Sequence, residues 1–196
     1  MKETKKIAKL MKSECGQCTA CCRELFLEIT DSDILRLVTH TGIPADKLVK
    51  LYSRTDIDCD EESDWVSLSC GKRALGLNKR RNGDCIFLSS SSTCTAYEAR
   101  PMTCRIFPLS VVYDDDDTID DIEISDVILD KSVKCKHRYG KGTSFKAFMA
   151  KAKKSQREGD SYLEKIDAWN ARHVKGKKND FLAFLGFRTS EKNSPA

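Results

Sequence analysis

Four cysteines fall within eight residues near the start of this 196-residue chain, at Cys15, Cys18, Cys21 and Cys22. The spacing Cys-x2-Cys occurs twice in this stretch, and Cys22 adds a further sulfur. Two thiolates separated by two residues can bind one metal ion, because the short turn between them brings their sulfurs within the span of a tetrahedral site. The cluster therefore predicts a fold organised around a metal.

The composition indicates the compartment in which this metal would be bound. The chain has ten cysteines, a modest formal net charge of +4, and neither the apolar core of a signal peptide nor a membrane-spanning apolar run. We therefore expect a cytoplasmic protein whose thiols stay reduced and bind metal rather than form disulfides. We expect no membrane contact and no nucleic-acid partner, and the sequence does not identify a protein partner.

The first half of the chain predicts alternating helices and short strands. We expect a helix over 2–12 and a strand over 25–29. Thr30 and Asp33 form a capping-box pattern that predicts a helix ending near Gly42. Pro44 suits the first turn of another helix, whose apolar stripe would be Leu48, Val49, Leu51 and Tyr52.

The second half predicts hairpins followed by helices. We expect a strand at 65–68, a reversal at Asn82 and Gly83, and a hairpin of 107–113 with 119–124. A helix follows from 144 with a break near Gly159, and a last helix lies around 181–187. The predicted class is α+β: a small, loop-rich, metal-stabilised domain at 1–139, a helical extension packing on it at 140–187, and a disordered tail at 188–196.

A second cysteine set lies at Cys85, Cys94, Cys104 and Cys135. Its surroundings read Cys-x-Phe-Leu at 85–88 and Cys-x2-Tyr-x2-Arg-Pro-x2-Cys-Arg-x-Phe-Pro at 94–108. Together with Cys-x2-Cys-x2-Cys-Cys at 15–22, these motifs closely resemble the YkgJ-type cysteine-cluster family of zinc- or iron-chelating domains. The resemblance covers roughly residues 13–137 and implies a metal-chelating cytoplasmic domain.

Eight cysteines are candidate ligands on this basis: Cys15, Cys18, Cys21, Cys22, Cys85, Cys94, Cys104 and Cys135. Cys59 and Cys70 fall outside the matched pattern, and we interpret them as non-ligands. Cys21 and Cys22 are adjacent, so their side chains point in different directions from a helix or a loop. We therefore expect a composite arrangement, in which residues 85–135 supply sulfurs that the first cluster lacks.

The metal is either iron or zinc. Structural zinc readily takes four cysteines, but Cys85, Cys94 and Cys104 are too far apart in sequence for the second Cys-x2-Cys of a zinc ribbon. The run Cys-x2-Cys-x2-Cys is typical of bacterial ferredoxins, but it lacks their Cys-x3-Cys-Pro continuation. We favour iron, as an iron–sulfur cluster, and keep zinc as the alternative.

Whether the chain is an enzyme is left open. The sequence contains no recognisable hydrolase triad, His-Glu-x-x-His helix or phosphate-binding loop. A related cluster motif occurs in flagellin lysine N-methylases, so the alternative function is an accessory or catalytic part of a methyl-transfer system. One observation argues against this alternative. The sequence has no Gly-x-Gly-x-x-Gly loop for an adenosyl cofactor, and Gly140 with Gly142 is only a weak match to one.

Overall fold

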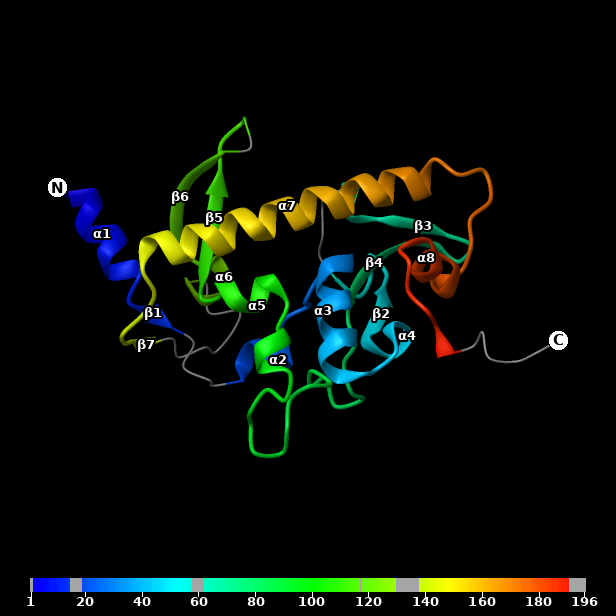
Figure 1. Ribbon diagram of the computed structural model, residues 1–196, viewed down its shortest axis with the longest axis horizontal. Coiled ribbons are helices and arrows are strands. Elements are labelled where there is room, and N and C mark those ends of the chain that lie inside the picture. Colours follow the sequence, from blue (N-terminus) through cyan, green and yellow to red (C-terminus); the bar gives the residue numbers. More distant parts are fainter. Residues whose placement is uncertain (1, 15–18, 58–61, 117, 130–137, 191–196) are drawn as a thin grey trace. The chain divides into compact units, whose positions relative to one another are not determined.

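The computed structural model describes residues 2–14, 19–57, 62–116, 118–129 and 138–190. The chain is a mixed α+β protein with short antiparallel sheets and several helices, of which α7 (Phe145–Asn170) is the longest (Figure 1). The α+β class predicted from the sequence is thus confirmed. No described helix is long and apolar enough to span a membrane.

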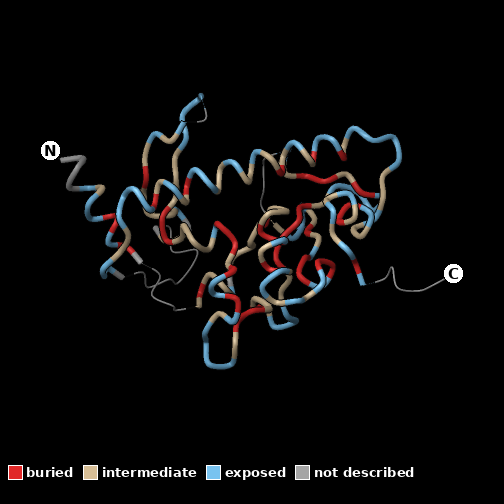
Figure 2. The backbone as a smooth tube through the Cα atoms, in the orientation of Figure 1, coloured by how far each residue is buried: buried red, intermediate tan, exposed pale blue. Residues whose placement is uncertain are grey.

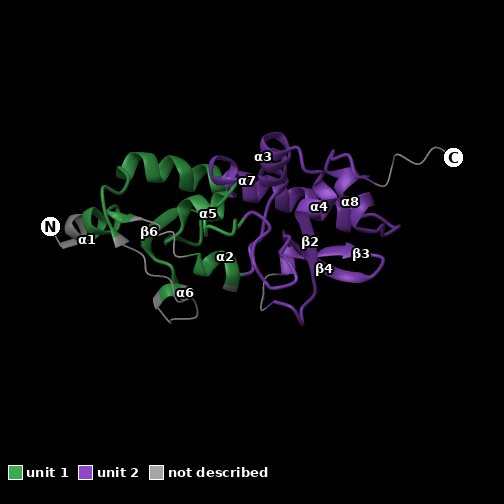
Figure 3. Ribbon diagram, turned by 90° about the horizontal axis from the view of Figure 1, so that it is seen from below, with its two compact units in different colours: residues 1–25, 88–95, 102–156 green, residues 26–87, 96–101, 157–196 purple. Residues whose placement is uncertain are grey.

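The chain divides into two compact units, which are coloured separately in Figure 3. Unit 1 consists of residues 1–25, 88–95 and 102–156, and unit 2 of 26–87, 96–101 and 157–196. Each unit is therefore assembled from three separate stretches of the sequence. The domain boundary predicted between residues 139 and 140 stays a prediction.

Unit 1 contains two small antiparallel pairs of strands. β5 (Leu109–Tyr113) pairs with β6 (Ile119–Ile124) as the predicted hairpin, and β1 (Ser13–Glu14) pairs with β7 (Arg138–Tyr139). The other elements of this unit are helices α1 (Lys2–Leu10), α2 (Ala20–Glu24), α5 (Met102–Ile106), α6 (Asp126–Leu129) and the first part of α7. Its buried apolar cluster comprises Leu10, Met11, Leu109, Ile122, Phe148 and Ala152.

Unit 2 is built on a three-stranded antiparallel sheet with the order β2-β4-β3. The strands are β2 (Val49–Tyr52), β3 (Val66–Leu68) and β4 (Gly71–Leu77). Helices α3 (Asp31–Thr41), α4 (Ala45–Leu48) and α8 (Lys178–Phe184), the short 3-10 turns η1 (Glu62–Asp64) and η2 (Tyr97–Ala99), and the end of α7 complete it. Figure 2 shows buried residues on several of these elements.

The core of unit 2 joins residues from both ends of the chain. Trp65, Leu75, Ile166, Trp169 and Phe181 are almost completely buried. The rings of Trp169 and Phe181 meet edge to face, with 5.3 Å between their centroids. The predicted C-terminal helices therefore contribute core residues to this unit.

Helix α3 has the ends that its sequence predicts. The Thr30 hydroxyl accepts a hydrogen bond from the Asp33 backbone N–H at 3.2 Å, and the Asp33 carboxylate accepts one from the Thr30 N–H at 3.1 Å. Gly42 ends the helix at φ 69°, and its N–H donates to the Val38 carbonyl. Glycine adopts this left-handed conformation without a steric penalty, which explains the stop.

Three local predictions are wrong. Residues 25–29 form no strand, because the only ladder contact there is an isolated bridge of Glu28 with Gly76. The helix that begins after Pro44 ends at Leu48, and the predicted stripe continues as strand β2 paired with β4. Helix α7 runs through Gly159 without a break.

The predicted disordered tail is described only in part. Thr189 is buried, and Ser190 donates its backbone N–H to Asp46 Oδ1 at 3.0 Å. Residues 191–196 lie outside the described part of the chain.

Two glycines of unit 2 give opposite predictions for the same substitution. A Cβ at Gly76 would clash with the Phe26 ring and lie 2.9 Å from Tyr52, whereas a Cβ at Gly159 would meet no heavy atom within 4 Å. We expect Gly76→Ala to lower the free energy of unfolding by about 1–3 kcal/mol through overpacking, and Gly159→Ala to raise it by about 1 kcal/mol through better helix propensity. Urea unfolding of the two variants measures both changes in the free energy of unfolding. Equal changes would contradict the packing around β4.

Candidate metal centre

Five of the eight candidate cysteines lie in the described part of the chain. Cys21, Cys22, Cys94 and Cys104 belong to unit 1, and Cys85 belongs to unit 2. All five are half-buried thiols. Cys15, Cys18 and Cys135 lie outside the described residues, as does Cys59.

Cys21 and Cys22 occupy successive positions of the short helix α2. Thr19 precedes the helix at φ 65°, and its carbonyl accepts a hydrogen bond from the Cys22 N–H at 3.0 Å. Arg23 Nε donates to the Thr19 hydroxyl at 3.3 Å. Neighbouring side chains on a helix point about 100° apart, so the two sulfurs leave the backbone in different directions.

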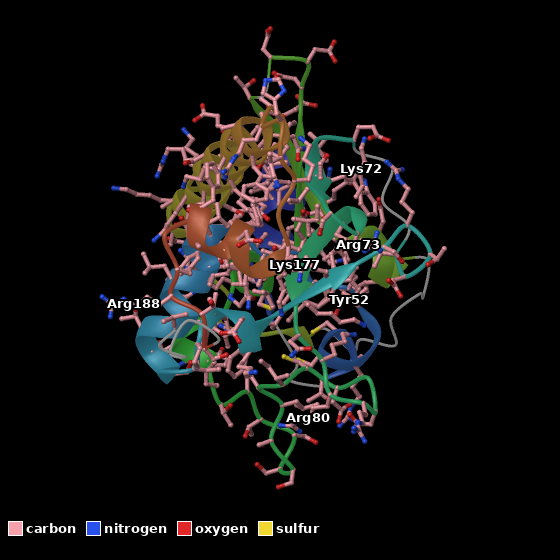
Figure 4. All side chains as sticks on the ribbon, turned by 90° about the vertical axis from the view of Figure 1, so that its right-hand side faces the viewer. Tyr52, Lys72, Arg73, Arg80, Lys177 and Arg188 are labelled. Atoms are coloured by element: carbon pink, nitrogen blue, oxygen red, sulfur yellow. The ribbon has the colours of Figure 1, made fainter. Side chains whose placement is uncertain are left out.

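Cys85 follows the tight reversal that Asn82 and Gly83 predict. The Arg80 N–H donates to the Asp84 carbonyl at 2.7 Å, and Gly83, at φ 86°, donates to the Arg80 carbonyl at 3.0 Å. Cys85 then forms an isolated antiparallel bridge with Lys79, which confirms the predicted turn. The guanidinium of Arg80, which is labelled in Figure 4, also donates to the Ile86 carbonyl at 2.9 Å. Hydrogen bonds therefore fix both the turn and the residues that follow it.

Tyr52 is a titratable residue whose pKa is influenced by Cys85. Burial, followed by the negative charges of Asp56 and Cys85, raises the pKa of Tyr52 above its usual value. The Tyr52 hydroxyl donates to the Leu77 carbonyl at 3.0 Å. The phenol of Tyr52 therefore stays neutral near pH 7 and acts as a hydrogen-bond donor, not as an acid or base.

Cys94 follows a turn that is closed by hydroxyl groups. The Ser89 N–H donates to the Thr93 carbonyl at 2.8 Å, and the hydroxyl of Ser89 lies 2.8 Å from those of both Ser91 and Thr93. Ser92 adopts φ 60°, and Cys94 forms an isolated bridge with Leu88. The polar run 89–93 is thus a hydrogen-bonded turn immediately before the thiol.

Cys104 lies on helix α5, which follows the motif Tyr-x2-Arg-Pro. The Arg100 guanidinium stacks on the Tyr97 ring, 3.6 Å from its centroid, and its Nε donates to the Tyr97 carbonyl at 2.9 Å. Arg100 is extended at φ −50° and ψ 142°, as expected for a residue before Pro101. Tyr97, Arg100 and Pro101 thus shape the chain before α5.

The described residues do not bring a complete ligand set together. Among them, no group of three or more histidine, cysteine, aspartate or glutamate side chains could hold a metal ion. The chemistry of the thiols fits zinc or iron, since both metals favour thiolate sulfur. The composite arrangement of the two cysteine sets stays a prediction, because three of its eight sulfurs lie outside the described residues.

Comparison with known proteins bears directly on these thiols. Residues 14–135 match the model of the CxxCxxCC family, which is described as a "Putative zinc- or iron-chelating domain". The chain belongs to the CxxCxxCC family. The matched region spans both cysteine sets and confirms the family predicted from the motifs. No curated protein and no solved structure matches the chain.

Cys70 differs in its exposure from the five described cysteines of the family motif. It occupies the turn between β3 and β4 and is exposed, whereas the five described candidates are half-buried. We expect iodoacetamide to label Cys70 before the five described candidates in the native protein, because access limits the reaction of a thiolate. Peptide mass spectrometry after timed labelling measures this order; labelling of Cys94 or Cys104 as fast as Cys70 would contradict the structure.

Proposed function

We propose that this CxxCxxCC protein chelates iron, as an iron–sulfur cluster, through cysteine thiolates, with zinc as the alternative metal. The observation that carries the proposal is the state of the described motif cysteines, which are half-buried thiols within the matched family region. The proposed ligands come from the eight motif cysteines named above, Cys15, Cys18 and Cys135 included.

Local backbone geometry supports this role. Cys85 and Cys94 each follow a reversal closed by backbone hydrogen bonds, and Cys104 lies on a helix. A ligand on a fixed backbone loses less conformational freedom when it binds a metal, which raises affinity. Preformed turns of this kind would therefore favour chelation.

Basic residues adjacent to the thiols also support it. Four thiolates on a divalent zinc ion, or on an oxidised four-iron cluster, leave a net charge of about −2, which needs nearby donors and cations. Arg23 follows Cys22 on α2, and Arg105 follows Cys104 on α5. Each arginine therefore places a positive charge one residue away from a candidate ligand.

We further propose that the protein works in the cytoplasm, where thiols stay reduced. The methyl-transfer alternative stays a prediction. Calorimetry with S-adenosylmethionine tests it, and measurable binding heat would be needed to sustain it.

Metal analysis of cysteine variants tests the chelation directly. Protein purified without oxygen is assayed for iron, zinc and acid-labile sulfide, and its visible spectrum is recorded. We expect Cys94→Ser and Cys104→Ser to weaken metal binding by about tenfold or more, since changing only an outer-shell partner already costs that much. Cys70→Ser is the matched control and should retain the metal. A colourless wild type with stoichiometric zinc would overturn the iron proposal; wild type without either metal would overturn both.

Removal of the metal should destabilise the protein. The turns before Cys85 and Cys94 are mainly polar, so ligation would provide long-range ties that their hydrogen bonds do not. We expect a chelator to lower the midpoint of thermal unfolding by several degrees, recorded by circular dichroism. An unchanged midpoint, with metal loss verified by elemental analysis, would contradict a stabilising role.

A further inference from the structure

The end of α1 and the segment that leads into α7 are joined backbone to backbone within unit 1. The Gly140 N–H donates to the Lys12 carbonyl at 2.9 Å. The Thr143 N–H donates to the Met11 carbonyl, also at 2.9 Å. Between these bonds, Gly142 adopts φ 65°, and a Cβ there would lie 2.0 Å from the Met11 carbonyl oxygen. The end of α1, β1, β7 and the start of α7 therefore meet at one junction (Figure 1).

Four exposed lysines lie on the segments that meet at this junction. Lys9 lies in the last turn of α1, and Lys12 follows that helix. Lys141 lies in the loop before α7, and Lys146 lies in the first turn of α7. Within the part of the chain that the structure describes, none of the four forms an ion pair. Like charges that the backbone holds near one another repel, so a bound anion would stabilise this surface.

Tyr139 of β7 exposes an aromatic ring at the same junction. The residue is 53% exposed, and Lys9 Nζ lies 5.6 Å from the centroid of its ring. β7 pairs with β1 so that Tyr139 lies opposite Ser13, the residue after Lys12. An exposed aromatic ring among lysines is typical of surfaces that bind single-stranded nucleic acids, because bases stack on the ring while phosphates bind the ammonium groups.

The charges of unit 1 are distributed unevenly over its surface. Many of its acidic residues lie in the hairpin of β5 with β6: Asp114, Asp115, Asp116, Asp120, Asp121 and Glu123. Lys6 Nζ lies 2.5 Å from Asp121 Oδ2, whereas Lys9 lies over the Tyr139 ring. The modest net charge of +4, from which we expect no nucleic-acid partner, therefore hides separate acidic and basic surfaces.

We propose that Lys9, Lys12, Tyr139, Lys141 and Lys146, here called the basic patch, bind single-stranded nucleic acid. The lysine ammonium groups contact the phosphates, and a base stacks on the exposed face of the Tyr139 ring. The first turn of α7 contains no acidic residue, so the positive end of the helix dipole adds to the attraction. Binding of this kind has little sequence preference, because every nucleotide offers a phosphate and an aromatic face.

A membrane surface is the other anionic partner to consider, and the packing of α1 argues against it. A helix that lies on a bilayer inserts its apolar face between the lipids. In α1 and the residue after it, Leu10 and Met11 are buried in the apolar cluster of unit 1, and Ile7 packs against that cluster. The apolar face of α1 is thus already covered by the protein, which favours the nucleic acid.

Fluorescence anisotropy of a labelled oligothymidylate of about 20 nucleotides, mixed with the full-length, metal-loaded protein, tests the lysines. Titrations are made from about 50 to 200 mM salt. At about 0.1 M salt, Lys12→Gln and Lys141→Gln should each weaken binding roughly fivefold and reduce the slope of log K against log salt by about 0.7. Lys47→Gln, which removes an exposed lysine of unit 2, is the matched control and should bind as wild type does.

The tyrosine is tested by a different signature in the same assay. Tyr139→Ala should weaken binding about fivefold or more, because a stacked base is lost, and should leave the salt slope unchanged. Tyr139→Phe keeps the aromatic face and should retain the affinity. Tyr113→Ala, which removes another exposed tyrosine of unit 1, is the matched control and should bind as wild type does.

Ultraviolet cross-linking of wild type to a bromouridine-substituted oligonucleotide needs no variant. Peptide mass spectrometry should find the cross-link on the peptide that contains Tyr139. No oligonucleotide binding at low salt, equal affinities of wild type, Lys12→Gln and Lys141→Gln, or cross-links confined to unit 2 would overturn the proposal. Binding to phosphatidylserine vesicles that Lys12→Gln weakens, without binding to the oligonucleotide, would also overturn it and assign the basic patch to a membrane surface. An unchanged affinity of Tyr139→Ala would contradict the stacking.

Discussion

The hydrogen bonds between the end of α7 and strand β3 hold unit 2 together. β3 is an edge strand, so one side of its backbone has no neighbouring strand. Asn170 accepts the Ser67 N–H at 2.7 Å and donates to the Trp65 carbonyl at 2.8 Å, while Trp169 Nε1 donates to the Ser67 carbonyl at 2.9 Å. These side chains take the place of the missing strand and at the same time bury the Trp169 ring. The core of unit 2 depends on these hydrogen bonds, because they hold the buried Trp169 ring against β3.

The cysteines are positioned by a different kind of structure. The segments before Cys85 and Cys94 are polar turns closed by their own backbone and hydroxyl groups. Such turns fix the direction in which a thiol leaves the chain, but they supply little apolar burial. Metal ligation, which the family description names, would add the stabilisation that these turns lack.

Local signals in the sequence predicted local structure well. The Thr30 capping box, the Gly42 stop and the hairpin of β5 with β6 are encoded by nearby residues, and each is confirmed. Val49, Leu51 and Tyr52 fit the periodicity of a helix or of a strand, and together with Leu48 they predict a helix at 49–52. Pairing with β4 decides in favour of a strand there.

Long-range features could not be predicted in the same way. The hydrogen bond between Ser67 and Asn170 joins residues more than one hundred positions apart, and no short motif marks either of them. The hydrogen bond from the Ser190 backbone N–H to Asp46 Oδ1 is also long-range, and no short motif predicts it. For the candidate site, the motif identified the family and five thiols that the structure describes, while the way in which the eight candidates share metal ligation stays a prediction.

X-ray absorption at the metal edge of anaerobically purified protein tests the central claim, metal ligation by cysteine, most directly. The account predicts a first shell made of sulfur, at about 2.3 Å from the metal. In the iron–sulfur form, a second shell made of iron would lie beyond this sulfur shell. A first shell composed of oxygen and nitrogen, without sulfur, would contradict chelation by these cysteines.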